Sequence, residues 1–305
     1  MLYFRSLDGV EIKNSWLTIG SFDGVHRGHQ AILKKLIEGA RANGAPAVVI
    51  TFFPHPAVIL GKRKNALYLN TPEERAELLG EYGADAVVMH PFNTHVANLT
   101  AYEFMHYLHQ HLYMKHMLVG PDFALGKGRE GNTQRLAELG EHFGYTLEVM
   151  PMVVNGDIMI SSSQIRTKLF EGDVEGAARL LGRPYRISGD VVHGDARGKS
   201  IGIPTANLSV WAERTIPKSG VYACKAWVED KPWDAVTNIG VRPTFEAETV
   251  IPRVEAHLLG FDDDLYGKEI KLDFVSRLRD EQRFASVQAL IDQINRDIET
   301  TRRIL

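Results

Sequence analysis

Short apolar runs alternate with amphipathic helical patterns along the first part of the chain. Apolar runs of strand length occur at residues 16–19, 47–53, 86–90, 117–120 and 147–150. Apolar residues recur at helical spacing in residues 29–42, 72–82, 100–113, 133–143 and 163–171. Strands separated by helices predict βαβ units, and therefore an α/β, Rossmann-like domain whose parallel sheet has helices on both faces.

The pattern changes near residue 183. Strand-like segments then follow one another at residues 186–193, 204–210, 220–229, 232–239, 251–260 and 269–276. The next helix-length apolar stripe comes at residues 280–298 and includes Phe284 and Val287. Consecutive short strands predict an antiparallel β-barrel with a C-terminal helix packed outside it. We therefore predict two domains, residues 1–182 and 183–305.

A stretch rich in glycine and histidine, residues 20–29, stands where the first predicted strand turns into the first predicted helix. Such a turn directs unpaired backbone N–H groups and the positive end of the helix dipole at a ligand, which favours phosphate. His26 and His29 are three residues apart and add donors on the same side of the first helical turn. The stretch predicts a nucleotide phosphate site. The candidate contacts in it are Gly20, Phe22, Asp23, Gly24 and Gly28.

Other polar clusters follow predicted strands of the same domain. Residues 51–56 place His55 between two prolines, which is also typical of a plain turn. Residues 120–123 contain Asp122. Three serines, residues 161–163, and Arg166 lie at the start of the helix predicted at 163–171, and this pattern fits either an ordinary N-cap or a second anion site. Ligands of such sheets lie beyond the carboxyl ends of the strands, where these clusters are expected.

Residues 126–131 match the glycine spacing of a dinucleotide-binding turn, but the context does not fit. Five residues separate the preceding strand from Gly126, so the tight strand-to-helix turn is missing. We interpret the run as a mobile loop made basic by Lys127 and Arg129.

The predicted barrel has its own polar candidates. Gly198, Gly202 and Pro204 suggest a flexible flap ahead of Thr205 and Asn207. Neutral oxygens two residues apart in a strand point to one side, and with phosphate oxygens they suit Mg²⁺. Glu255, aimed into the mouth of the barrel, is a candidate general base. Taken alone, these side chains fit an ordinary solvated strand face equally well or better.

Composition narrows the class of protein. The 305 residues are 44% apolar and 24% charged, with a formal net charge of −3, so there is no basic excess typical of a nucleic-acid partner. A single cysteine, Cys224, excludes internal disulfides and suits a reducing cytoplasm. No signal peptide or apolar segment long enough to span a membrane is visible, so we expect a cytoplasmic protein that does not enter membranes.

Nine motifs in order make the whole chain resemble the prokaryotic bifunctional riboflavin kinase/FMN adenylyltransferase (FAD synthetase) family. The first half resembles the nucleotidyltransferase module through residues 20–29 (GSFDGVHRGH), 51–56 (TFFPHP), 119–123 (VGPDF) and 161–166 (SSSQIR). The second half resembles the flavokinase module through residues 191–194 (VVHG), 204–208 (PTANL), 238–245 (NIGVRPTF), 254–258 (VEAHL) and 264–267 (DLYG).

The resemblance implies two reactions that use ATP and Mg²⁺. Riboflavin would be phosphorylated to FMN, with Glu255 as the base and Thr205 and Asn207 as ligands of Mg²⁺ and phosphate. FMN would then be adenylylated to FAD with release of pyrophosphate. His26 and His29 would stabilise phosphate charge in this step. The resemblance also implies that Ser162, Ser163 and Arg166 bind the leaving pyrophosphate and that Asp122 contacts the nucleotide. The flap, with Gly194, Gly198, Gly202 and Pro204, would close over ATP. Phe53 and Tyr266 would contact the flavin.

Departures from the family pattern are small. Ser163 stands where the family usually has threonine, Lys199 where it has arginine, and Ile203 where it has phenylalanine. Three alternatives remain: one active module only, a flavin-binding sensor on the same fold, and a Zn²⁺ site at His26 and His29. The zinc alternative lacks a nearby third protein ligand other than Asp23. The sequence does not indicate an oligomeric state.

Overall fold

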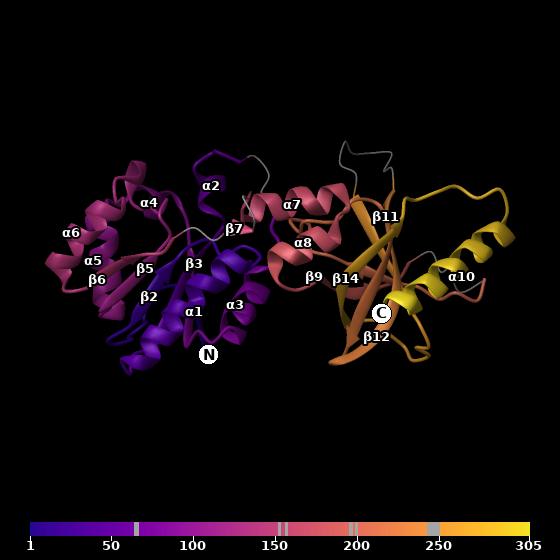
Figure 1. The fold of residues 1–305 in the computed structure, drawn as a ribbon, viewed down its shortest axis with the longest axis horizontal. Helices are drawn as coiled ribbons and strands as arrows, with labels where there is room; N and C mark the ends of the chain where they lie inside the picture. Colours follow the sequence, from indigo (N-terminus) through magenta and orange to yellow (C-terminus); the bar gives the residue numbers. More distant parts are fainter. Residues whose placement is uncertain (64–66, 152–153, 156–157, 195–197, 199–200, 243–250) are drawn as a thin grey trace. The chain divides into compact units, whose positions relative to one another are not determined.

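The structure is a computed structural model that describes residues 1–305 apart from 64–66, 152–153, 156–157, 195–197, 199–200 and 243–250 (Figure 1). The chain divides into two compact units, Met1–Ser161 and Ser162–Leu305. Each unit is described by itself below.

The first unit is built on a six-stranded sheet in which every pair of neighbours is parallel. In the order β1-β4-β3-β2-β5-β6, the strands are β1 (Leu2–Phe4), β4 (Ala86–Pro91), β3 (Ala47–Phe53), β2 (Trp16–Ile19), β5 (His116–Val119) and β6 (Thr146–Val149). The five predicted strands are confirmed to within one residue at each end. β1 was not predicted, because three residues are too short to show a period. A two-stranded pair, β7 (Val154–Asn155) and β8 (Ile158–Met159), lies outside the main sheet and was also not predicted.

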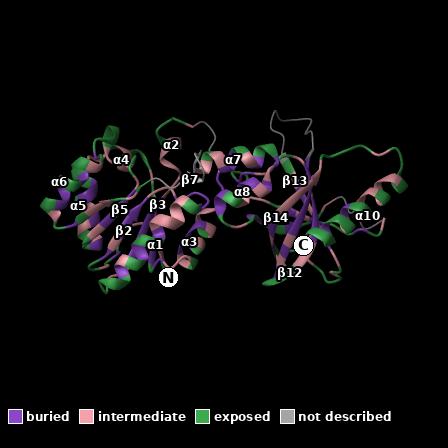
Figure 2. Cartoon of the chain, in the orientation of Figure 1, coloured by how far each residue is buried: buried purple, intermediate pink, exposed green. Residues whose placement is uncertain are grey.

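Helices cover both faces of this sheet, as predicted (Figure 2). The helices are α1 (Arg27–Ala42), α2 (Pro56–Ile59), α3 (Pro72–Glu81), α4 (Thr94–Asn98), α5 (Ala101–Leu112) and α6 (Thr133–Phe143), with a single 3₁₀ turn, η1 (Lys127–Arg129). One core cluster joins α5 and α6 to strand residues such as Val48, and the other joins α1 and α3 to residues such as Val49. Successive strand residues point to opposite faces, which is why Val48 and Val49 enter different cores.

Strand order reverses at β2. The sheet continues through β3 and β4 on one side of β2, and through β5 and β6 on the other. In open α/β sheets, ligands bind beyond the carboxyl ends of the strands at such a reversal. The glycine–histidine stretch, residues 20–29, follows β2 directly and therefore stands at this position.

In its described residues, the second unit contains two helices, a closed barrel and a terminal helix. Its elements are α7 (Ser162–Glu171), α8 (Val174–Leu181), β9 (Tyr185–Val192), β10 (Ala206–Ser209), β11 (Gly220–Val228), β12 (Lys231–Arg242), β13 (Ile251–Leu258), β14 (Glu269–Arg279) and α10 (Val287–Ile304). The strands close in the order β10-β13-β12-β11-β14-β9, and all neighbours are antiparallel. The predicted barrel with a C-terminal helix is confirmed.

The predicted start of the terminal helix is wrong. The helix begins at Val287, where the Ser286 side chain accepts a hydrogen bond from the Ala289 N–H and caps it. β14 ends at Arg279, and Phe284 lies in the connection before the helix with the Arg279 guanidinium over its ring. The apolar residues of this connection extended the stripe in the sequence beyond the helix itself.

Packing places α7 and α8 with the barrel. The Ser276 hydroxyl of β14 donates to the Glu175 carboxylate of α8 at 2.5 Å, and the Lys218 N–H donates to the Leu169 carbonyl of α7 at 2.9 Å. The contacts therefore divide the chain after Ser161, earlier than the domain boundary predicted after Gly182. The boundary at residue 182 remains a prediction about where the two functional modules meet in the sequence.

Candidate functional site

The glycine–histidine stretch forms a tightly turned loop between β2 and α1. Phe22 and Val25 have φ values of 47° and 40°, which are uncommon for residues with a side chain, and Gly24 has a φ of 82°. The Gly24 N–H donates to Asn70 Oδ1 at 2.6 Å, and the Val25 N–H donates to the Phe22 carbonyl at 3.0 Å. The loop is thus held in an unusual backbone conformation by specific hydrogen bonds, which is typical of functional sites.

His26 and His29 come together at the start of α1. His26 is the N-cap, and its Nδ1 accepts a long hydrogen bond, 3.4 Å, from the His29 N–H. The two imidazole rings stack with centroids 3.7 Å apart. A Cβ atom at Gly28 would lie 3.1 Å from the His26 ring, so glycine allows this close approach. Among the described residues, the N–H groups of Arg27 and Gly28 have no protein acceptor, so they remain available to an anion.

His29 is partly buried and lies beside the buried His26. Its ring also lies against Phe22, with centroids 4.9 Å apart, and its buried Nδ1 has no hydrogen-bond partner among the described residues. Burial, with smaller effects of His26 and Arg75, holds the pKa of His29 well below its ordinary value. At neutral pH the ring is therefore uncharged and offers an N–H donor rather than a full positive charge.

The depressed pKa of His29 predicts that acid destabilises the first unit. Below about pH 6.5, His29 binds a proton in the unfolded chain but not in the folded protein. The contribution of the neutral ring to the free energy of unfolding is therefore complete above that pH and is lost as the pH falls toward the folded pKa. We expect the stability difference between wild type and His29→Gln, measured by chemical denaturation, to change between pH 7 and pH 5. His95→Gln, at an exposed position on α4, is the matched control. A difference that does not vary with pH would contradict the prediction.

Asp23 and Phe22 face into the protein. The Asp23 side chain is 2% exposed, and its Oδ1 accepts a hydrogen bond from the Leu69 N–H at 2.8 Å. Phe22 is buried in the core beneath α1, where a Cβ atom at Gly20 would lie 3.0 Å from its ring. Both residues therefore shape the loop, while the direct nucleotide contact predicted for them stays a prediction.

The end of β3 supplies the second cluster of this unit. His55 is the N-cap of α2, and its Nδ1 accepts a hydrogen bond from the Ala57 N–H at 3.0 Å, which agrees with the interpretation as a turn residue. The Phe53 ring lies 5.5 Å from that of Tyr68, centroid to centroid. Flavin contact by Phe53 stays a prediction.

The segment after β5 contains the glycine-rich run 126–131. Leu125 and Gly131 close it with a β-bridge, and a Cβ atom at Gly126 would lie 2.6 Å from the Ala101 nitrogen of α5, while the predicted mobility of the run stays a prediction. Arg129 donates to the Asp122 carbonyl at 2.7 Å. Asp122 itself is exposed, and its predicted nucleotide contact stays a prediction.

Ser162, Ser163 and Arg166 lie in the first turns of α7, in the second unit. Arg166 is 9% exposed and its Nη2 donates to Ser163 Oγ at 3.3 Å. The serines and the arginine therefore form one cluster. That this cluster binds the leaving pyrophosphate stays a prediction.

Three polar residues form a row across neighbouring strands of the barrel. In the strand register, Glu255 of β13 stands opposite Asn207 of β10 on one side and Asn238 of β12 on the other. Its neighbours Val254 and Ala256 are buried, whereas Glu255 is partly exposed. The row therefore lies on the outer face of the barrel, so the expectation that Glu255 points into the barrel mouth is wrong. The alternation of β13 sends its apolar residues inward and its polar residues outward.

Arg253 connects members of this row and was missed in the sequence. Its Nε donates to Asn207 Oδ1 at 2.8 Å and lies 2.6 Å from Glu255 Oε1. Asn238 Nδ2 donates to Glu281 Oε1 at 3.4 Å. The spacing of two residues between Arg253 and Glu255 was the available signal, because it places both on the same strand face.

The flap residues lie against this row. A Cβ atom at Gly194 would lie 2.2 Å from the Asn207 amide, and one at Gly198 would lie 3.3 Å from Thr205 Oγ1. The Pro204 carbonyl is 2.7 Å from His257 Nδ1, and Gly202 has a φ of 77°. Lys199 lies outside the described residues, and Ile203 is buried. The glycines thus allow backbone to approach the two oxygen-bearing side chains closely.

The side-chain oxygens of Thr205 and Asn207 are suitable ligands for a small hard cation. Both offer neutral oxygens on the side of β10 away from the buried Ala206 and Leu208. Asn207 Oδ1 accepts one hydrogen bond from Arg253, and a carbonyl oxygen has a second lone pair. Within the described part of the chain, no three His, Cys, Asp or Glu side chains are grouped as a metal site. The oxygen donors suit a cation that keeps most of its ligands as phosphate and water.

Tyr266 belongs to the barrel unit and lies beside the flap. Its ring stacks on His193, with centroids 4.0 Å apart, directly before Gly194. It is 52% exposed. An exposed aromatic pair at this place suits stacking with a planar ring, and flavin contact stays a prediction.

Comparison with known proteins assigns a different family model to each half of the chain. A model described as FAD synthetase matches residues 10–164, and one described as riboflavin kinase matches residues 181–305. The chain is 40% identical over 288 residues to the bifunctional riboflavin kinase/FMN adenylyltransferase of Pseudomonas fluorescens, covering 94% of this chain and 92% of that protein. It is 37% identical over 290 residues to the protein of the same description from Bacillus subtilis (strain 168), covering 94% and 91%.

A solved structure from Streptococcus pneumoniae, described as a macrolide-efflux protein, has the same fold. Its TM-score is 0.89 at 30% identity, with 99% of this chain and 98% of that chain covered. Across the described parts of our chain, we find no helix with both the length and the apolar character needed to cross a membrane.

Proposed function

Since the chain belongs to the bifunctional riboflavin kinase/FMN adenylyltransferase family, we propose that it converts riboflavin to FAD in two steps that each consume ATP. In the first, the 5′-hydroxyl of riboflavin takes the γ-phosphoryl group of ATP, which gives FMN and ADP. In the second, a phosphate oxygen of FMN attacks the α-phosphorus of ATP, which gives FAD and pyrophosphate. We assign the first step to the barrel unit and the second to the α/β unit.

In the kinase step, Glu255 accepts the proton of the attacking hydroxyl. Thr205 and Asn207 would hold Mg²⁺, which when bound would neutralise charge on the transferring phosphoryl group. Arg253 orients both Asn207 and Glu255 through its Nε. Gly194 and Gly198 let the flap backbone close over the phosphates and exclude water.

In the adenylyl-transfer step, positioning and charge stabilisation supply the catalysis, and no covalent nucleophile is needed. His29 donates a hydrogen bond from its uncharged ring, and the Arg27 and Gly28 N–H groups donate from the start of α1. His26 holds the ring of His29 in place by stacking. We further propose that Ser162, Ser163 and Arg166 bind the leaving pyrophosphate.

One observation supports the two-step proposal most directly. Each unit contains its own cluster of polar residues, His26 and His29 in one and Asn207 and Glu255 in the other, and each cluster falls within a different family model. The test is to incubate purified protein with riboflavin, ATP and Mg²⁺ and to separate the flavins by chromatography. We expect FMN to appear first and FAD to follow.

The same experiment distinguishes the alternatives. FMN without FAD, or FAD formed only when FMN is supplied, would indicate one active module. Binding of flavin without any product would indicate a sensor and would overturn the proposal. Replacing Mg²⁺ with EDTA should stop both reactions, and adding back individual divalent cations tests the choice of metal. We also propose that the protein is cytoplasmic and that its partners are the small molecules riboflavin, FMN and ATP.

A further inference from the structure

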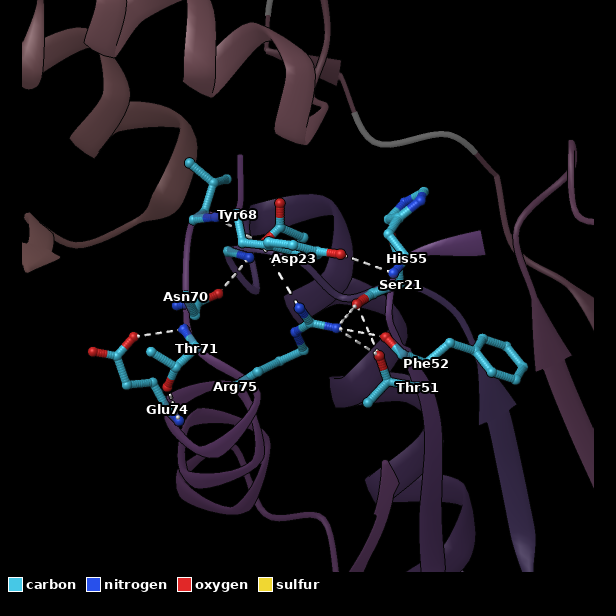
Figure 3. Close-up of polar contacts among 12 residues, drawn as sticks. Ser21, Asp23, Thr51, Phe52, His55, Tyr68, Asn70, Thr71, Glu74 and Arg75 are labelled. Atoms are coloured by element: carbon cyan, nitrogen blue, oxygen red, sulfur yellow. Dashed lines mark hydrogen bonds and ion pairs between the residues drawn. The ribbon is translucent and has the colours of Figure 1, made fainter. Parts of the chain in front are cut away.

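Arg75 is a buried cation in the α/β unit that none of the reaction steps above uses. It lies in the first turns of α3 and is 1% exposed, the largest of the fully buried side chains. α3 begins with a capping box between Thr71 and Glu74, which fixes where Arg75 projects (Figure 3). An arginine this buried is unusual, because removing a charge from water is costly unless specific partners compensate.

The partners of Arg75 are the two loops at the carboxyl ends of β2 and β3. Its Nη1 donates to the Ser21 carbonyl at 2.9 Å, to Thr51 Oγ1 at 3.2 Å and to the Phe52 carbonyl at 3.2 Å. Thr51 Oγ1 also donates to the Ser21 carbonyl, at 2.8 Å. These contacts converge in Figure 3. One guanidinium nitrogen thus connects the loop that begins the glycine–histidine stretch to the neighbouring strand end.

Compensation of the charge is incomplete. Asp23 Oδ1 lies 4.0 Å from Arg75 Nη2, too far for a hydrogen bond, and Arg75 Nε and Nη2 have no hydrogen-bond partner among the described residues. The Tyr68 ring lies beneath the guanidinium at 5.9 Å. A purely stabilising role would be served equally well by an apolar side chain of similar volume. The arrangement therefore points to a requirement for geometry at the two loops.

The segment that leads into Arg75 contacts the same two loops. Leu69 N–H donates to Asp23, Asn70 accepts from Gly24, and Tyr68 Oη accepts from the His55 N–H at 2.9 Å. Residues 68–75 therefore hold both loops, the one after β2 and the one after β3. Phe22 follows Ser21 directly and packs on His29, so displacement of Ser21 is transmitted to the reacting histidine. The charge of Arg75 also contributes, after burial and His26, to lowering the pKa of His29.

We propose that Arg75 is a positioning residue for adenylyl transfer, which sets the separation of the Ser21 and Thr51 loops and thereby the placement of Phe22 and His29. The inference rests on the proposed function of the α/β unit. It does not give Arg75 any contact with substrate.

The test compares Arg75→Met, Arg75→Lys and the matched control Arg135→Met, an arginine of α6 that lies at the surface beside Glu138. Initial rates of FMN adenylylation and riboflavin phosphorylation are measured in the same preparation, at a temperature well below each variant's thermal unfolding. We expect kcat for adenylylation to fall about 10- to 100-fold in Arg75→Met, because small misplacements of reacting groups have effects of that size. The kcat of Arg75→Lys for adenylylation should lie between those of wild type and Arg75→Met, since one ammonium cannot reproduce the guanidinium geometry. Phosphorylation, and both rates in Arg135→Met, should stay within about twofold of wild type.

Other outcomes are informative as well. If Arg75→Met unfolds more easily but its folded form keeps wild-type kcat and KM for adenylylation, Arg75 is structural and the proposal is wrong. If Arg75→Met does not fold, Thr51→Val supplies the test, because it removes the hydroxyl that accepts from Arg75 and donates to the Ser21 carbonyl while nearly preserving side-chain volume. The kcat of Thr51→Val for adenylylation should fall less than that of Arg75→Met. In the double variant Thr51→Val/Arg75→Lys, the fold-loss of kcat should be smaller than the product of the two single losses. Wild-type kcat in Thr51→Val would also overturn the proposal. A wild-type protein that forms no FAD from FMN would refute the proposed function instead.

Discussion

Glu255→Gln should lower the rate of riboflavin phosphorylation by about 10²- to 10⁴-fold, the usual contribution of a general base. Glutamine keeps the size of the side chain and a hydrogen-bonding oxygen, but it cannot accept the proton of the ribityl hydroxyl. The rate of FMN formation is measured with riboflavin and ATP, and FAD formation is measured separately with supplied FMN. FMN adenylylation should not change, because it is assigned to the other unit.

Two further variants make the Glu255 result specific. Glu269→Gln changes an exposed glutamate at the start of β14, on the same barrel, and should leave phosphorylation unchanged. Arg253→Met removes the side chain that contacts both Glu255 and Asn207 and should weaken phosphorylation less than Glu255→Gln. If Glu255→Gln retains full kinase activity, the row Asn207–Glu255–Asn238 is not the reaction centre.

His29→Ala should lower the rate of FMN adenylylation by about 10²- to 10³-fold, as expected when one preorganised donor to a charged transition state is removed. Riboflavin phosphorylation in the same sample should be unaffected and so reports on the integrity of the barrel unit. Circular dichroism and thermal unfolding report on the α/β unit. His95→Ala is the control, at an exposed histidine of α4.

The size of the His29 effect separates two roles. His29→Gln keeps a side-chain donor and should retain more activity than His29→Ala if the imidazole N–H acts on phosphate. Equal losses in the two variants would indicate that the ring matters for packing against Phe22 and His26. Normal adenylylation in His29→Ala would remove the histidine pair from the mechanism.

The sequence predicts the sheet well because its strands are short apolar runs bounded by turn residues. The bounds of β2 and β3 agree with the prediction at both ends, and α6 begins and ends at the predicted residues. β1 was not predicted because three residues are too few to show a period. The start of α10 was predicted too early because apolar residues of the preceding loop continue the helical stripe.

The site is predictable only in part, for a physical reason. The residue types and spacing of His26 and His29 make them candidates for a phosphate site, whereas Glu255 alone fits a solvated strand face and becomes a candidate base through the family resemblance. Arg75 stands after Thr-Pro-Glu-Glu at the start of an amphipathic helix, where charged residues normally face solvent. Its burial depends on Ser21 and Thr51, which are distant in sequence, and no local pattern records that contact.

The outward position of Glu255 has a consequence for how this enzyme can change. Along β13, Val254, Ala256 and Leu258 fill the barrel, while Arg253, Glu255 and His257 face away from it. Substitutions of the first set alter packing and the free energy of unfolding, whereas we expect those at Arg253 and Glu255 to alter the proposed kinase reaction. Selection can therefore act on thermal tolerance and on turnover separately, through alternate residues of one strand.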